Sequence, residues 1–332
     1  MKRKKFIFSM SAGVVSLLPG PFHSITSAPL GSRNNPKSIP RKAIIPAALT
    51  PIDEDGKIDF ADFRRHISDL ADVHGVSAIM VNGASGHGST LSREEKRKLL
   101  GEALAVVGDR IAILAAVKES EAVLTLSPLA KDAQSEGAHA LTIMPPDAPE
   151  GFSWEFANKR FEAVLSACSL PLAIYQTKYD TETLVRLADF PTVFAVKEGS
   201  VDPSTFERNM RALRALDKEI AVWSTHSKWL LADLAIGADG ILSGMGSVAA
   251  DLQVALAEAV ERSDLATARQ INERIFPLAQ VFYGPGQDPH VRMKYALKRL
   301  GRQKFDFMRP PFQALIEAEC AAIDRALKQS GI

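Results

Sequence analysis

Eight short apolar runs recur at regular intervals from residue 43 onward, and amphipathic stretches with helical spacing separate them. Each run has the length and composition of a strand buried on both faces, as the strands of parallel sheets are. Strands that alternate with helices predict a parallel sheet, and eight such units favour a closed (β/α)8 barrel, or TIM barrel. The expected strands lie within residues 43–49, 76–82, 110–117, 138–144, 171–176, 192–197, 219–224 and 238–243.

A doubly wound open sheet is the alternative arrangement for this pattern. That fold usually carries a glycine-rich phosphate turn directly after its first strand. The segment that follows the first run here reads ALTPIDEDG and contains no such turn. Because this turn is missing, we expect the closed barrel. One of the intervening stretches also carries a helix start signal, because Ser92 and Glu95 have the spacing of a capping box.

The alternation of strands and helices stops near residue 246, and the remaining pattern is helical only. We predict a barrel over residues 43–246, a linker over residues 29–42 and a C-terminal helical extension over residues 247–332. The last helices have no further strands to cover. We expect them to pack on the flank of the barrel or to form an oligomer contact.

The N-terminus has the order of a secretory signal. MKRKK precedes a mostly apolar run, and a stretch of small residues ends at Ala28, so we predict a signal peptide over residues 1–28. The segment RKKFI resembles a twin-arginine signal, which leaves both the Sec and the Tat route open; a basic tail is the alternative. Removal of this segment takes away four cations and no acid, shifting the formal net charge from +1 to −3. We expect an exported, periplasmic protein.

The charge balance limits the classes of partner. Lysine and arginine total 40 and aspartate and glutamate total 39, so no excess of positive charge favours nucleic acid or an acidic membrane surface. The seven histidines show no HExxH motif and no clustered spacing, so we expect neither a metal nor another cofactor. The expected ligand is a small molecule, and the expected assembly is a homo-oligomer, a dimer or a tetramer. Cys168 and Cys320 are expected to be free thiols.

Lys197 closes the apolar run TVFAVKEGS, at a point where a buried strand should end. The chemistry of a TIM barrel takes place at the carboxyl ends of the strands and in the loops that follow them. A lysine at such a point could simply extend its charge to water. If apolar neighbours enclose it, the charged form is disfavoured, its pKa falls, and a neutral amine becomes available to attack a carbonyl. Lys197 is therefore a candidate for Schiff-base catalysis.

Six segments between residue 43 and about residue 301 form an ordered set of motifs: ALTPIDEDGKID, NGASGHGSTLSREE, IYQ, VKEGS, GADGILSG and VRMKYALKRLG. In this order they resemble the motifs of the dihydrodipicolinate synthase and N-acetylneuraminate lyase family of class I, pyruvate-dependent aldolases. The resemblance implies a TIM barrel whose lysine forms a covalent imine with a 2-oxo acid. The chain would be a divergent, exported member.

The resemblance also assigns roles to individual residues. Lys197 matches the Schiff-base lysine, and Ser85 matches a hydroxyl that binds the carboxylate of a 2-oxo acid. The amides of residues 83–86 would assist Ser85, because a turn of small residues can direct N–H groups at an anion. Tyr175 matches a tyrosine of the fifth strand, for which core packing is the alternative role. The expected substrate-binding positions are Thr50, Gly83, Ala84, Ser85, Gly86, Asp147 and Gly244.

The sequence departs from the family pattern at several of these positions. Ala84 replaces the first of two loop hydroxyls, and His87 replaces a glutamate. Pro146 and Asp147 stand where the resemblance implies the tyrosine that shuttles protons during imine formation. The arginine that synthase members often carry for a second carboxylate has no evident counterpart in DAPEGFSWEF. Together with export, these losses predict that the chain is not a lysine-biosynthesis enzyme.

Another side chain could carry the missing proton. His87 is the first candidate, because imidazole titrates near neutral pH and this residue follows the carboxylate loop. Asp147 could act if burial raised its pKa, and Lys118 could supply positive charge for an acidic substrate group. His226, at the end of the seventh strand, is a further candidate. Each of the four also has a purely structural role open to it, as a surface or turn residue.

Three functions remain open on the sequence alone. The first is a lyase or aldolase that forms an imine with a 2-oxo acid, pyruvate or a 2-keto-3-deoxy sugar acid, and makes or breaks the adjacent C–C bond. The second is a hydratase or dehydratase that acts through the same imine. The third is an exported, catalytically weakened binding protein on the same barrel. The retained Lys197 favours an enzyme, because a binding protein has little use for a partly buried amine.

Overall fold

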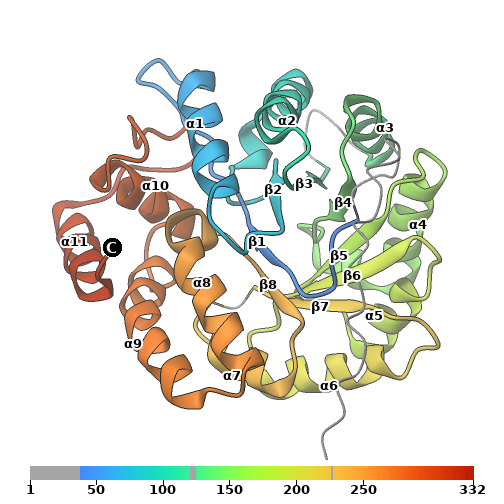
Figure 1. Cartoon of the computed structure of the whole chain (residues 1–332). Helices are drawn as coiled ribbons and strands as arrows, with labels where there is room; N and C mark the ends of the chain where they lie inside the picture. Colours follow the sequence, from blue (N-terminus) through green and yellow to red (C-terminus); the bar gives the residue numbers. More distant parts are fainter. Residues whose placement is uncertain (1–37, 120–124, 226) are drawn as a thin grey trace, which may run out of the picture. The chain divides into compact units, whose positions relative to one another are not determined.

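The computed structural model describes residues 38–119, 125–225 and 227–332 of the chain. The predicted signal peptide, most of the predicted linker and His226 lie outside these residues. Eight parallel strands form a ring that helices surround (Figure 1). The strands are β1 (Ile44–Pro46), β2 (Ala78–Val81), β3 (Ala112–Val117), β4 (Ala140–Ile143), β5 (Leu172–Gln176), β6 (Val193–Glu198), β7 (Ala221–Ser224) and β8 (Gly240–Ser243).

The strand order confirms the predicted (β/α)8 barrel. Each strand pairs with its neighbours in sequence, and β1 pairs with β8. Isolated parallel bridges from Ile44 to Val76 and from Ala47 to Met80 join β1 to the β2 segment and complete the ring. Every strand lies within one residue of the range expected from the apolar runs. The runs were informative because strands covered by helices on the outside and packed side chains on the inside must be apolar on both faces.

The helices that follow the strands have ordinary start signals. The barrel helices are α1 (Phe60–Ala71), α2 (Arg93–Val107), α3 (Ser127–Glu136), α4 (Trp154–Leu165), α5 (Thr181–Ala188), α6 (Pro203–Arg214), α7 (Leu230–Ile236) and α8 (Gly246–Glu261), with short 3₁₀ turns at Gly88–Thr90 and Pro149–Phe152. The predicted capping box of α2 is present: the Ser92 side chain accepts from the Glu95 amide at 3.1 Å, and the Glu95 side chain accepts from the Ser92 amide at 2.8 Å. This reciprocal pair satisfies two amides that the helix itself cannot.

Alternate residues of the strands fill the inside of the barrel. Many of them are alanine, and larger apolar residues such as Met80, Leu114, Met144 and Trp223 fill the space between. Successive side chains of a strand point to opposite faces, so the row that contains Ala173 continues to Tyr175 and the row that contains Ala195 continues to Lys197. The interior rows of β5 and β6 therefore end in Tyr175 and Lys197, at the carboxyl end of the barrel.

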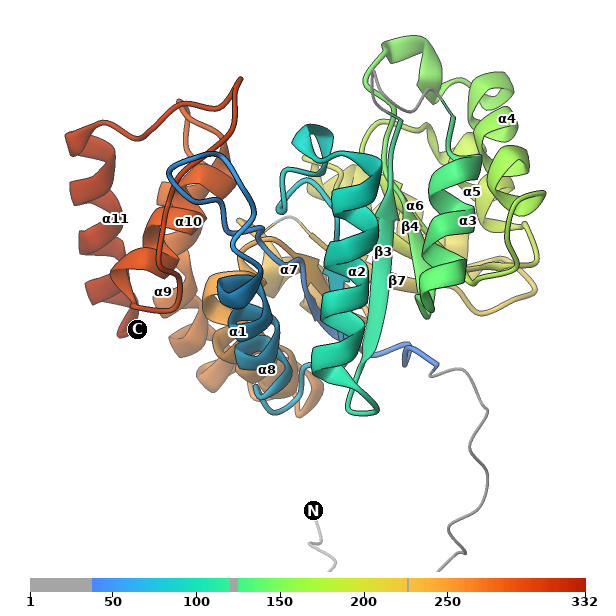
Figure 2. The same ribbon diagram turned by 90° about the horizontal axis from the view of Figure 1, so that it is seen from above.

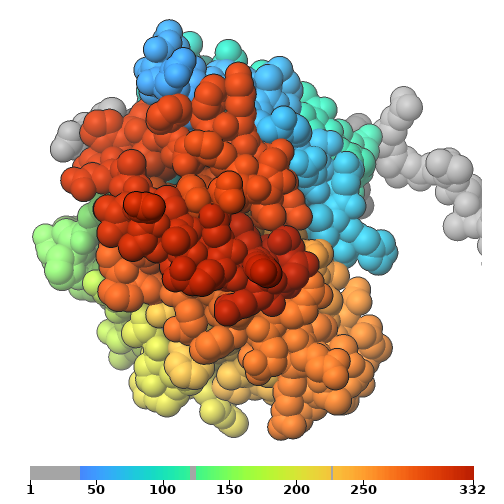
Figure 3. Space-filling view, turned by 90° about the vertical axis from the view of Figure 1, so that its left-hand side faces the viewer, coloured from blue at the N-terminus to red at the C-terminus, as the bar shows by residue number. Residues whose placement is uncertain are grey.

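Three further helices cover the flank of the barrel, as the sequence pattern predicts. They are α9 (Leu265–Phe282), α10 (Pro289–Arg299) and α11 (Glu317–Ser330), and they pack on α8 and on one another (Figure 2). The predicted domain boundary at residue 246 falls at the start of α8, which contacts both β1 and β8 and so serves as the eighth helix of the barrel. Figure 3 shows the red C-terminal segment between the orange helices α8 and α9 and the blue segment around α1. The Lys304 amide donates to the Asp62 carboxylate, and the Arg309 guanidinium donates to the Gly56 carbonyl. These two hydrogen bonds join the C-terminal segment to the region around α1.

Both cysteines are free thiols, as expected: Cys168 is buried and Cys320 is half-buried. Among the helices of residues 38–119, 125–225 and 227–332, none combines the length and the apolar character needed to span a bilayer.

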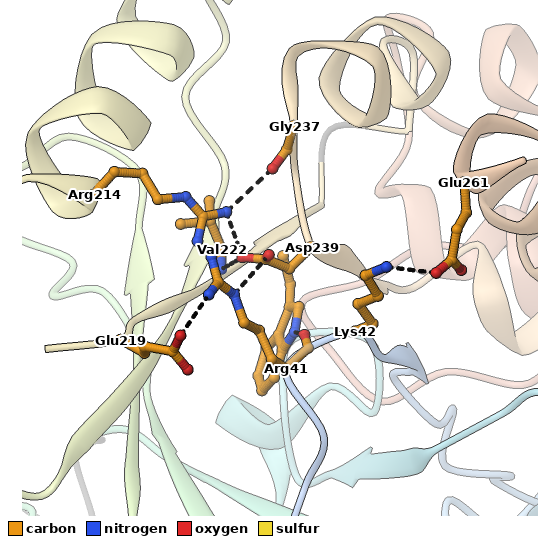
Figure 4. Close-up of polar contacts among 9 residues, drawn as sticks. Arg41, Lys42, Arg214, Glu219, Val222, Gly237, Asp239 and Glu261 are labelled. Carbon is orange, nitrogen blue, oxygen red and sulfur yellow. Dashed lines mark hydrogen bonds and ion pairs between the residues drawn. The ribbon is translucent and has the colours of Figure 1, made fainter. Parts of the chain in front are cut away.

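A polar cluster around Asp239 joins strands β7 and β8 to the segment before β1 (Figure 4). The Asp239 carboxylate accepts from the Arg41 guanidinium, the Arg214 guanidinium and the Val222 amide, each at 2.8 Å. Arg41 also contacts Glu219 at 3.3 Å, and Lys42 pairs with Glu261. The last two residues of the predicted linker are thus held against the barrel, where they anchor the entry to β1.

Loss of the Asp239 carboxylate should destabilise the fold. Asp239→Ala should lower the free energy of unfolding by about 3 kcal/mol, because two guanidinium groups and one amide lose an acceptor that is only 9% exposed. Chemical denaturation measures this change. Glu219→Ala is the matched control: Glu219 also pairs with Arg41, but its side chain is 85% exposed, so its loss should change stability by less than about 0.5 kcal/mol. Equal effects of the two substitutions would contradict the role given to Asp239.

Candidate active site

Lys197 lies buried at the carboxyl end of β6, with 4% of its surface exposed. Burial lowers the pKa of its amine to about 7, because an ammonium group in an apolar enclosure loses its hydration. Its Nζ atom lies 3.9 Å from the centre of the Tyr175 ring. An amine with this pKa is largely neutral at slightly alkaline pH, which is the form that attacks a carbonyl.

Glu198, the neighbour of Lys197 in the sequence, points to the other face of β6. Its carboxylate accepts from the Ser200 amide at 2.8 Å and from the Asn209 side chain of α6 at 3.1 Å. Burial raises the pKa of Glu198 to about 7. The glutamate therefore belongs to the contact between the barrel and α6, and the lysine alone faces the interior.

Tyr175 stands opposite Lys197 in the register of β5 and β6. Its hydroxyl hydrogen-bonds to Thr225, the first residue after β7, and burial raises its pKa. A side chain at position 199 would place its Cβ 3.0 Å from both the Tyr175 ring and the Gln176 carbonyl. Gly199 therefore keeps the loop after β6 from crowding the tyrosine that lies beside the lysine.

A second phenol reaches the same end of the barrel from the C-terminal helices. Tyr283 follows α9, and the Ser227 hydroxyl donates to its oxygen at 3.2 Å. Burial raises the pKa of Tyr283 to about 12, and the nearby Tyr175 acts in the same direction. Tyr283 is thus near Tyr175, whose ring contacts the Lys197 amine. Both phenols therefore stay protonated at neutral pH.

The loop after β2 is tightly wound. Asn82 and His87 have positive φ angles of 63° and 51°, which are uncommon for residues with a side chain and which recur at binding sites. The His87 amide donates to the Ala84 carbonyl at 2.8 Å, and the Gly88 amide donates to the Gly83 carbonyl at 3.0 Å. A Cβ at position 88 would lie 2.2 Å from the Asn82 carbonyl oxygen, so only glycine fits. This folding of the loop buries Ser85 to 3% exposure.

Ser85 and Thr50 both contact glycines of neighbouring loops. The Ser85 hydroxyl lies 2.7 Å from the point where a Cβ of Gly244 would stand, at the end of β8. The Thr50 hydroxyl lies 2.9 Å from the corresponding point of Gly86. The structure therefore brings together the predicted residues of the first, second and eighth strand ends, as it brings together those of the fifth and sixth.

His87 occupies a more enclosed position than the sequence suggests. Its Nε2 lies 3.3 Å from an Asp288 oxygen, and its ring lies 4.2 Å from the Phe312 ring. Burial lowers the pKa of His87 to about 4, and its Nδ1 is enclosed without a partner among the described residues. At neutral pH this imidazole is neutral, and it packs between the β2 loop and the C-terminal segment.

The predicted residues of the third and fourth strand ends form an exposed pair. Lys118 and Asp147 lie 2.5 Å apart, and the Asp147 side chain is 82% exposed. The burial that would make Asp147 a general acid is therefore missing. Nearby, Arg160 of α4 forms two hydrogen bonds of 2.7 Å to Glu119 and a third, of 2.9 Å, to the Met144 carbonyl. Its guanidinium is thereby engaged with the protein itself.

His87, Asp288 and His290 form the one group within the described chain whose ligand atoms lie close enough, within 4.8 Å of one another, to hold a metal ion. The Asp288 Oδ1 atom already accepts from three donors: the His290 amide at 2.8 Å, the His290 Nδ1 at 3.0 Å and the His87 Nε2 at 3.3 Å. A metal would have to displace these contacts, so the residues fit a hydrogen-bonded cluster better than a metal centre.

Sequence reasoning missed Tyr283, Asp288 and His290. They lie in the C-terminal segment, and the rule that places barrel chemistry in the loops after strands does not extend to it. The segment does carry one local signal: Asp288 followed by Pro289 is the start signal of a helix, and Asp288 is the N-cap of α10. Nothing in that signal shows that the helix begins beside the barrel mouth.

Comparison with known proteins gives one consistent result. The family model described as the dihydrodipicolinate synthetase family matches residues 40–330. Two curated relatives are named 4-hydroxy-tetrahydrodipicolinate synthase: one from Moorella thermoacetica is 30% identical over 87% of this chain and 98% of its own, and one from Kineococcus radiotolerans is 31% identical over 88% and 94%. Neither name supports the expectation that the chain is not a lysine-biosynthesis enzyme.

A solved structure extends the likeness to three dimensions. It is YagE, a prophage protein of the dihydrodipicolinic acid synthase family from E. coli K12, in complex with pyruvate. Its TM-score against this chain is 0.79 at 22% identity, and the match covers 87% of this chain and 98% of that one. At this identity the match bears on the fold, and it agrees with the barrel described above.

Replacement of the buried lysine should stabilise the protein. An unfolded lysine keeps its proton up to pH about 10.5, whereas folded Lys197 loses it near pH 7, so the Lys197 contribution to stability rises between these two values. Lys197→Met should therefore raise the free energy of unfolding at pH 7, on the order of 3 kcal/mol, and flatten its rise toward pH 10. Part of the slope should remain, because burial also lowers the pKa of Lys294 to about 7.

Thermal and denaturant unfolding between pH 7 and pH 10 measures this effect. Lys57→Met is the control, because the Lys57 side chain is 75% exposed and its loss should change little. A loss of stability in Lys197→Met would mean that the ammonium is well solvated or paired in the folded protein.

Proposed function

The chain belongs to the dihydrodipicolinate synthetase family, which supports a pyruvate-dependent class I lyase in general, and from this premise we propose that Lys197 forms an imine with a 2-oxo acid. The observation that carries the proposal is the buried amine with a pKa of about 7 at the carboxyl end of β6. In the simplest form the substrate is pyruvate or a 2-keto-3-deoxy sugar acid, and the reaction makes or breaks the C3–C4 bond.

The amine supplies the chemistry of bond cleavage. Neutral Nζ attacks the C2 carbonyl, the resulting carbinolamine loses its hydroxyl as water, and a protonated imine remains. The C4 hydroxyl then loses its proton and becomes the carbonyl of a departing aldehyde, while the C3–C4 bonding pair moves into a C2–C3 double bond and the imine nitrogen takes up the π pair. The enamine is protonated at C3, and hydrolysis returns the free amine and the keto acid. No external oxidant or reductant enters.

The loops around the lysine orient the substrate. Ser85, buried beside Gly244, would donate its hydroxyl to the substrate carboxylate. Tyr175 would lie along the new C–N bond, because its ring is already against the Lys197 amine. Its raised pKa keeps its proton available for the departing hydroxyl.

The same imine serves more than one reaction. A hydratase or dehydratase would use it to expel water from C4 rather than to cleave carbon from carbon. The synthase named for the two curated relatives would use it to join two molecules, so formation of 4-hydroxy-tetrahydrodipicolinate belongs among the reactions to assay. The buried lysine argues against a binding protein. Burial of an ammonium group lowers the stability of the folded protein, and a site that only binds its ligand does not need a reactive amine.

Trapping with borohydride tests the proposal directly. Reduction of the protein with pyruvate present should add one pyruvate-derived mass to a peptide that contains Lys197, and the trapping rate should increase as pH rises through about 7, as the amine loses its proton. Lys197→Arg should abolish the adduct. Lys118→Ala, which alters only the exposed pair with Asp147, should keep it. An adduct on any other lysine would move the active site.

Ser85 should set the affinity for the 2-oxo acid. Ser85→Ala should raise the pyruvate concentration for half-maximal trapping about tenfold, because a hydrogen bond to a carboxylate is worth roughly 1.5–3 kcal/mol. The exposed Ser169 provides the control, and Ser169→Ala should leave this concentration unchanged. If Ser85→Ala binds pyruvate as well as the wild type does, the β2 loop is not the carboxylate site.

A further inference from the structure

Imine chemistry needs a group that moves a proton at C3, and several groups at this end of the barrel are poorly suited to the role of base. Burial raises the pKa values of Tyr175 and Tyr283, so both phenols hold their protons at neutral pH. Asp147 is exposed and paired with Lys118. The Nε2 of His87 is bonded to Asp288, and its other nitrogen, Nδ1, is buried. His290, the second histidine that contacts Asp288, is the remaining candidate.

Asp288 fixes the protonation pattern of the two histidines that face it. Its Oδ1 atom lies 3.0 Å from the His290 Nδ1 and 3.3 Å from the His87 Nε2. A carboxylate can only accept, so each of these nitrogens must carry the hydrogen. In the neutral ring the second nitrogen is then an acceptor. His290 is thereby left with a lone pair on Nε2, and Asp288 stands ready to stabilise the imidazolium that forms when Nε2 takes up a proton.

The Nε2 atom of His290 faces the proposed substrate site. It lies 3.2 Å from the point where a Cβ of Gly244 would stand, and the Ser85 hydroxyl lies 2.7 Å from that same point. The imidazole nitrogen and the hydroxyl thus approach one space at the end of β8. In a 2-oxo acid only C2 separates the carboxylate from C3. A base beside the carboxylate-binding hydroxyl is therefore within reach of C3.

The side chains that contact His290 come from two parts of the chain. Asp288 is the N-cap of α10, and His87 belongs to the loop after β2. His290 meets His87 edge to face, with 5.7 Å between ring centres. Asp288 is the anion among these groups, and its two contacts with His290, through the ring and the backbone amide, hold the imidazole in place.

We propose that His290 is the catalytic acid–base of this site and that Asp288 is its positioning residue; the proposal rests on the proposed imine at Lys197. His290 Nε2 takes the proton from C3 of the imine. The C–H pair becomes the C2–C3 double bond, the imine nitrogen receives the π pair, and the new imidazolium is paired with Asp288. In the reverse direction the imidazolium returns the proton to C3 of the enamine.

Exchange of the pyruvate methyl hydrogens in D2O isolates this step, because it needs the enamine but no second substrate. Proton NMR should show exchange by the wild type and a loss of about 100-fold or more in His290→Gln, while borohydride trapping at Lys197 reaches the same extent. Retained trapping shows that the variant is folded. The exposed His74 provides the matched control, and His74→Ala should exchange at the wild-type rate.

Two further variants separate catalysis from structure. In His290→Ala, added imidazole should restore exchange in proportion to its concentration, which no loss of packing would allow. Asp288→Asn should slow exchange while trapping continues, because an amide cannot stabilise the imidazolium as a carboxylate does. Asp288→Glu should recover part of the rate.

The outcomes distinguish this proposal from the one on which it rests. Wild-type exchange in His290→Gln with trapping intact would overturn the role of His290 alone, and loss of exchange only in His87→Asn would transfer that role to His87. Failure of the wild type to trap any 2-oxo acid would overturn the imine and the acid–base pair together. One equivalent of bound zinc that disappears in His290→Gln, with exchange abolished by a chelator, would make the cluster a metal centre and overturn the acid–base role.

Discussion

Burial of the Lys197 amine is the constraint on which the active end of the barrel depends. The inside of the barrel is filled by apolar side chains, and Lys197, at the end of one interior row, is only 4% exposed. An amine held there lowers the stability of the folded protein and gains reactivity in return. Tyr175 covers the amine, and Gly199 leaves room for the tyrosine. Tyr175 and Tyr283 are themselves buried, which keeps both phenols protonated at neutral pH.

The barrel itself could be predicted closely from the sequence. Parallel strands buried on both sides must be apolar throughout, so each of the eight left a visible run. The capping box at Ser92 was equally readable, because it depends on two residues at a fixed spacing. The start of α8 was harder to place, since a helix that closes a barrel and a helix that lies outside it have the same periodicity.

The site was predictable only where it follows the strands. Lys197, Tyr175, Ser85 and Thr50 all lie at strand ends, and the fold brings them to one end of the barrel. Lys118 and Asp147 follow strands too, yet they form an exposed pair, because position in a loop does not determine burial. Tyr283, Asp288 and His290 enter the mouth from the C-terminal helices. Only the packing of α9 and α10 against the barrel reveals them.

The proposed chemistry depends most on the lowered pKa of the Lys197 amine, and titration of this amine measures that pKa directly. Nitrogen-15 labelled lysine allows the Nζ resonances to be followed by NMR from pH 5 to pH 11, and Lys197→Met identifies the signal that belongs to this residue. Burial predicts a pKa of about 7 for it. A pKa near 10.5, the value of a lysine in water, would mean that the ammonium is hydrated and would contradict the account.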